Sequence, residues 1–95
     1  MVAGVNELEC EKVYKLRYNN KVRLAVVLED NYDSYLCWDF TANQYRTFAH
    51  DRIDFNSVED VTDKAVIRDG DQRERFGHRD VRSCYHDGRT YTVRF

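Results

Sequence analysis

Residues 32–53 read YDSYLCWDFTANQYRTFAHDRI, and this stretch decides the fold. Residues 34–40 are rich in aromatic side chains, which favour strands. Residues 41–43, Thr-Ala-Asn, are short and polar, and residues 44–49 continue with a second run of strand-forming side chains. The stretch therefore predicts two antiparallel strands joined by a tight turn.

Two further strands are predicted upstream of this hairpin. Residues 11–18, EKVYKLRY, place apolar and charged side chains in alternation, which is typical of a half-buried strand. Asn19 and Asn20 tolerate the left-handed backbone of a tight turn, and residues 22–28 again carry apolar side chains at every second position. Polar turn residues occupy 29–33, so we predict a four-stranded meander.

Downstream of Ile53 the pattern loosens. Residues 65–67, Ala-Val-Ile, are compatible with a short fifth strand, whereas residues 62–80 as a whole read as a polar loop with one helical turn at 72–76. The chain then ends in a predicted hairpin over residues 81–95, because Asp87-Gly88 lies between two alternating runs.

These elements predict a mainly β protein, a small antiparallel SH3/Sm-like barrel of about five to seven short strands. The expected organisation is one domain over residues 1–95: a meander at 10–61, a polar loop at 62–80 and a hairpin at 81–95. A twisted open sheet covered by residues 54–80 is the alternative.

Composition narrows the function classes. The longest apolar run, residues 24–28, is far below the roughly 20 residues of a membrane helix, so we expect no membrane partner. The N-terminus has no pattern of a secretory signal, and three cysteines are an odd number, which together predict a cytoplasmic protein. Residues 1–63 hold 7 basic and 12 acidic side chains, giving −5, whereas residues 64–95 hold 8 and 5, giving +3. No cofactor is predicted.

Residues 13–53 resemble the WYL domain, a family whose members carry an SH3- or Sm-like barrel. The resemblance rests on the strand with Tyr18 and the following Arg23, on Tyr35-Leu36, on residues 46–48 (Arg-Thr-Phe) and on residues 51–53 (Asp-Arg-Ile). It implies a regulatory module that contacts nucleic acid or a nucleotide-like ligand through a basic and aromatic face. The residues that it implies for this contact are Tyr35, Arg46, Phe48, Arg52 and Arg23.

The residues themselves support two interpretations of this face. Arg46 and Phe48 are two positions apart on one strand, so they share a face, where a guanidinium pairs with phosphate and an exposed ring stacks on a base. Alternatively, Phe48 is a core residue and Arg46 bonds a carboxylate such as Asp39 or Asp51. Arg52 likewise has a structural alternative, an ion pair with Asp51 that braces the turn.

A second function class stays open: a small accessory or inhibitory protein, of the kind that a phage encodes, that binds a host protein or a transcription or defence complex. Exposed edges of a small sheet offer such a partner a docking strand, and they also leave homodimerisation open. An enzyme is not predicted, because Cys84 and His86 form the only close thiol–imidazole pair and lack a third orienting group or a second ligand pair.

Overall fold

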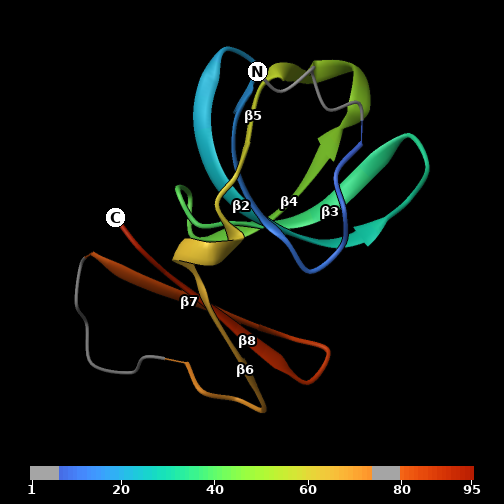
Figure 1. The fold of residues 1–95 in the computed structure, drawn as a ribbon. Coiled ribbons are helices and arrows are strands. Elements are labelled where there is room, and N and C mark those ends of the chain that lie inside the picture. The colour runs from blue at the N-terminus through green and yellow to red at the C-terminus, as the bar shows by residue number, and fades with distance from the viewer. Residues whose placement is uncertain (1–6, 74–79) are drawn as a thin grey trace.

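The protein is mainly β. The computed structural model describes residues 7–73 and 80–95, which form eight strands in two antiparallel sheets (Figure 1). The first sheet has five strands in the order β4-β3-β2-β1-β5, and the second has three in the order β6-β8-β7. The strands are β1 Val13–Tyr18, β2 Lys21–Asp30, β3 Ser34–Asp39, β4 Gln44–Ala49, β5 Ile53–Asp60, β6 Val66–Asp69, β7 Val81–His86 and β8 Arg89–Arg94. Two short 3-10 helices, η1 His50–Arg52 and η2 Thr62–Lys64, flank β5.

The turns form where the sequence predicts them. Asn19 and Asn20 have φ values of 51° and 66°, so the β1–β2 turn uses the left-handed conformation that asparagine tolerates. Gly88 adopts φ 82° in the β7–β8 turn, where a residue with a Cβ would be strained. The predicted four-stranded meander and the C-terminal hairpin are both confirmed.

The middle of β2, residues 25–28, is buried on both faces, which explains its uninterrupted apolar run. Ala25 and Val27 face a first core on one side of the five-stranded sheet, together with rings of β1, β3 and β4. Val26 and Leu28 face a second core, which the five-stranded sheet shares with β7 and β8. Because both faces of β2 are covered, its side chains no longer alternate between apolar and polar.

The three-stranded sheet lies against the outer face of the five-stranded one (Figure 1). Tyr91 and Val93 of β8 and Cys84 of β7 are its buried contributions to the second core. Arg82 of β7 ties the two sheets together, since its guanidinium donates hydrogen bonds to the carbonyl oxygens of Phe40 and Thr41. The β3–β4 turn is thereby fixed to the C-terminal hairpin.

Three details of the sequence prediction need correction. Residues 53–60, expected to be irregular, form β5, which pairs with β1 through a bulge. The short strand expected at 65–67 is confirmed as β6, but the predicted polar loop 62–80 also contains η2, and the described residues form eight strands. The edge strands β4 and β5 do not pair with each other in the described residues, so the five-stranded sheet is curled rather than closed by a strand ladder. The helical turn expected at 72–76 lies mostly outside the described residues.

Among the described residues, no helix is both long enough and apolar enough to cross a membrane.

Candidate functional site

The two aromatic residues of the predicted face are core residues. Phe48 is fully buried and stacks on Tyr18, with ring centroids 4.5 Å apart. Tyr35 is 2% exposed, and its hydroxyl oxygen accepts a hydrogen bond from the backbone N–H of Leu8 at 3.1 Å. Neither ring therefore presents a surface on which a base could stack.

The two arginines Arg23 and Arg46 converge on one carboxylate. Asp39, the last residue of β3, is fully buried, and its Oδ2 lies 3.6 Å from a nitrogen of Arg23 and 3.9 Å from Nε of Arg46. The strand register causes this meeting, because Asp39 pairs with Ala25 of β2 and Gln44 of β4, and each arginine is two residues from one of these positions on the same face. The alternative interpretation, Phe48 in the core and Arg46 beside Asp39, is the observed one.

The other oxygen of Asp39 organises the β3–β4 turn. Oδ1 accepts hydrogen bonds from the backbone N–H groups of Thr41 at 2.9 Å and Ala42 at 3.3 Å. Aspartate is favoured at such positions because its short side chain reaches the backbone two or three residues ahead. Asp39 is thus held in place by hydrogen bonds from its own turn.

The ion pairs at Asp39 are poorly formed. Both distances exceed the roughly 2.7–2.9 Å of a good charge-assisted hydrogen bond, and Asp39 Oδ2 and Arg23 Nε are buried without a hydrogen-bond partner in the part of the chain that the structure describes. Side-chain exposure is 15% for Arg23 and 34% for Arg46, so the arginines reach the surface from the buried carboxylate. Two positive charges and one negative charge leave the cluster with a net charge of +1.

Such a cluster is difficult to explain by stability alone. A buried ion pair offsets its desolvation only when its hydrogen bonds are nearly ideal. Buried polar atoms are normally satisfied, yet here Arg23 Nε, a donor, lacks an acceptor and Asp39 Oδ2, an acceptor, lacks a donor. An anion with several acceptor oxygens fits the need of the guanidinium donors alone, because Asp39 Oδ2 needs a donor.

Arg52 is separate from this cluster. It lies in η1 and is exposed, and its carbonyl oxygen accepts a hydrogen bond from the N–H of Asn19 at 3.3 Å. No ion pair joins it to Asp51 or to any other carboxylate of the described residues, so the predicted brace is not formed.

Sequence reasoning missed Lys21. It lies opposite Tyr18 in the β1–β2 register, two residues from Arg23 on the same face, and its side chain is exposed. The period of two along β2 was the signal that could have found it. Asp39 was noticed in the sequence only as one carboxylate within reach of Arg46.

Cys84 and His86 do not form a reactive pair. Burial raises the pKa of the Cys84 thiol to about 11, so the thiol is protonated at neutral pH. His86 instead lies 4.0 Å from Glu29 and contacts the ring of Tyr45. Within residues 7–73 and 80–95, no group of three or more His, Cys, Asp or Glu side chains is arranged to hold a metal ion.

No protein-family model, no curated protein and no solved structure matches this chain. The resemblance to the WYL domain therefore rests on the residues of 13–53 alone.

Proposed function

We propose that this protein is a non-enzymatic regulatory module, similar to a WYL domain, that binds a phosphate-bearing ligand through Arg23 and Arg46. The ligand class is a nucleotide or a short single-stranded nucleic acid. The observation that carries the proposal is the unsatisfied cluster in which both arginines share one buried carboxylate at 3.6 and 3.9 Å.

The chemistry of the guanidinium supports this ligand. Its planar fork of N–H donors matches the oxygens of a phosphate, and hydrogen bonds of this kind are stronger than neutral ones. At Asp39 these donors are held near a charge without forming good hydrogen bonds. A phosphate at the surface supplies the acceptors, and Lys21 on the same face adds a third positive charge.

The burial of Tyr35 and Phe48 changes the expected mode of binding. Base stacking on these rings is not available, so recognition depends on charge and on the backbone of the ligand. Contacts to phosphates carry little sequence information and weaken steeply with salt. We therefore expect binding that is tolerant of base sequence.

The test is fluorescence anisotropy with a labelled oligo-dT and with unlabelled nucleotides as competitors. Arg46→Gln is expected to lower the affinity about tenfold or more, because one charged hydrogen-bonding partner of the phosphate is removed. Arg68→Gln is the matched control, since Arg68 is exposed on β6, in the other sheet. Absence of salt-sensitive binding by the wild-type protein near about 50 mM salt contradicts the proposal.

Asp39→Asn makes the test sharper. The amide keeps an acceptor for the turn but removes the competing negative charge, so the affinity for phosphate is expected to rise about fivefold. A purely structural cluster predicts no such gain. Circular dichroism of each variant verifies that the fold is retained.

We also propose a cytoplasmic location. Its support is the state of the cysteines: Cys10, Cys37 and Cys84 are all free thiols, as expected of a protein in a reducing compartment.

A further inference from the structure

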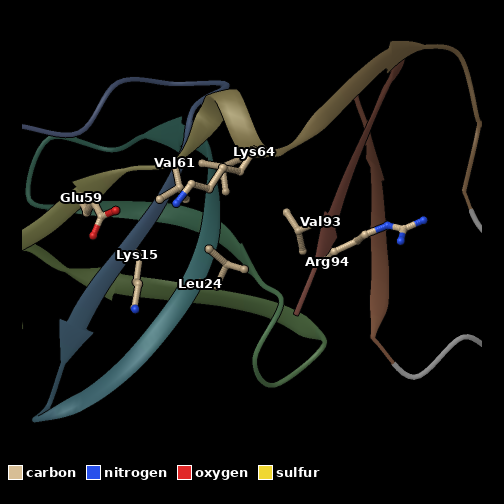
Figure 2. A pocket seen from close by; sticks show the side chains of 8 residues that line it. Lys15, Leu24, Glu59, Val61, Lys64, Val93 and Arg94 are labelled. Carbon is tan, nitrogen blue, oxygen red and sulfur yellow. The ribbon is translucent and has the colours of Figure 1, made fainter.

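A groove opens between the two sheets, on the opposite face of the β1–β2 hairpin from Arg23. Its volume is about 180 Å³. The apolar part of its lining is made by Val13, Leu24, Val61 and Val93. Figure 2 shows Val93 of β8 pointing across the groove toward Leu24 and Val61 on the side of the five-stranded sheet.

At this groove the three-stranded sheet stops covering the five-stranded sheet. Val13 and Val93 are buried in the second core, whereas Leu24 is only partly buried and Val22, next on the same face of β2, is 48% exposed. The apolar floor therefore continues out of the groove along β2. A ligand seated in the groove has an open path along this strand.

Charged side chains form the rim. Lys15 of β1 lies opposite Leu24 in the register, and Lys64 of η2 lines the same groove. Neither lysine forms an ion pair with a carboxylate of the described residues. Glu59 faces Lys15 from β5, and Arg94 directs its guanidinium away from the groove in Figure 2, so the rim carries a net charge of +1.

We propose that this groove binds an acidic segment of a partner protein, with one aliphatic side chain inserted between the sheets and neighbouring carboxylates at Lys15 and Lys64. The volume is below the roughly 300–1,000 Å³ of pockets that enclose small-molecule ligands, and it suits a single side chain of leucine or valine size. Extended peptides place alternate side chains into such pockets while their remaining residues follow the surface. The free lysines select carboxylates, and the apolar floor distinguishes the groove from a phosphate site.

This site is independent of Arg23 and Arg46. Arg23 pairs with Leu16 on the inner face of the hairpin, whereas Leu24 pairs with Lys15 on the outer face. The protein can therefore hold an anionic ligand on one face and a partner protein on the other. A variant that loses one of these two binding activities can still be tested for the other.

The test uses a labelled acidic peptide with one central leucine, followed by fluorescence anisotropy. Two control peptides replace the leucine by serine or the acidic residues by lysine. Burial of a leucine contributes about 1.5–3 kcal/mol, so the parent peptide is expected to bind about tenfold or more tightly than the serine peptide. The lysine peptide is expected not to bind.

Variants of the protein locate the binding. Lys64→Glu and Lys15→Glu are each expected to weaken binding severalfold, whereas Arg68→Glu, a comparable charge reversal on β6, is expected to leave it unchanged. In NMR spectra, the amide signals of Val61, Lys64 and Val93 are expected to shift when the parent peptide is added.

Three outcomes overturn the proposal: equal binding of all three peptides, equal effects of Lys64→Glu and Arg68→Glu, or signal shifts that map to another surface. Sedimentation of the protein without peptide tests the competing occupant. The protein could instead form a concentration-dependent dimer. If the parent peptide does not dissociate this dimer and Leu24→Gln abolishes it, the groove is occupied by a second copy of the chain.

Discussion

Phe48 of β4 stacks on Tyr18 of β1 with an interplanar angle of 17°, although no strand pairing joins β4 to β1. The contact spans the first core, between strands that lie three places apart in the sheet order. The hydroxyl oxygen of Tyr18 also accepts a hydrogen bond from the N–H of Ala49 at 3.0 Å. Side chains, rather than a ladder of backbone hydrogen bonds, thus hold the curl of the five-stranded sheet.

Phe48→Ala is expected to destabilise the protein by about 3–5 kcal/mol, the usual cost of truncating a buried ring. Tyr45→Ala is the control on the same strand. Tyr45 is 50% exposed and touches Trp38 edge to face, so its loss is expected to cost only about 1 kcal/mol. Urea unfolding followed by circular dichroism measures both values. Similar costs for the two variants contradict the assignment of Phe48 to the core.

Asp39→Ala and Asp39→Asn separate the two roles of this carboxylate. Alanine removes the acceptor of two backbone N–H groups in the β3–β4 turn, so we expect a loss of about 1–3 kcal/mol in the free energy of unfolding. Asparagine keeps that acceptor and removes only a charge that has no well-formed ion pair, and its cost is expected to be smaller. If thermal melting finds the two variants equally destabilised, the charge is structurally essential and the case for an anion site at Arg23 and Arg46 weakens.

The sequence predicted the meander because β1 alternates clearly and short polar turns separate the strand-forming runs of β2, β3 and β4, yet it did not decide which face of β4 is buried. Tyr45 and Thr47 lie on one face and Arg46 and Phe48 on the other, and each face carries one aromatic and one polar residue. Periodicity identifies the two faces without ranking them. Phe48 packs against Tyr18, and this contact buries the ring. The ring that the sequence predicted as a stacking surface is therefore part of the core.

Strand β5 was missed for a different reason. Arg17 pairs with Asp54, but Lys15 pairs with Glu59, so several residues of β5 bulge out between these two pairs. The hydroxyl oxygen of Ser57 in this bulge accepts a hydrogen bond from the N–H of Arg17 at 2.8 Å. A bulge breaks the period of two that identifies a strand in the sequence. The groove between the sheets could not be predicted from the sequence either, since its lining comes from four strands (β1, β2, β5 and β8), from Val61 and from η2.

The three cysteines are expected to differ in reactivity. Cys10 is exposed, whereas Cys37 and Cys84 are buried. Burial raises the pKa of the Cys37 thiol to about 12, so it is both inaccessible and protonated near neutral pH. A thiol reagent at neutral pH is expected to modify one cysteine rapidly in the native protein and all three after unfolding in guanidinium. Rapid modification of more than one native thiol contradicts the burial of Cys37 or Cys84.

The same burial predicts a loss of stability in alkali. The pKa values of Cys37 and Cys84 are raised in the folded state from 9.0 to about 12 and about 11, so the unfolded state loses these protons first. Their contribution to stability is fully present below about pH 9 and declines as the pH rises through the folded values. Urea unfolding between neutral pH and pH 11 measures the slope. Cys37→Ala is expected to flatten it.

Arg82 is expected to couple the two sheets during unfolding. Its guanidinium donates to the carbonyl oxygens of Phe40 and Thr41, and hydrogen bonds to charged groups contribute about 1.5–3 kcal/mol each. Trp38, the single tryptophan, packs against the second core between the sheets, so its fluorescence reports on their contact.

Because the two sheets share this core, the fluorescence of Trp38 and the far-UV circular dichroism are expected to change at one urea concentration in the wild-type protein. Arg82→Ala is expected to lower the stability by at least about 1.5 kcal/mol. Arg68→Ala, which removes an exposed arginine from β6, is expected to change it by less than about 0.5 kcal/mol. If the fluorescence of the Arg82 variant changes at a lower urea concentration than its circular dichroism, the C-terminal sheet detaches before the five-stranded sheet unfolds. Equal stability of the two variants would instead show that the shared core alone joins the sheets.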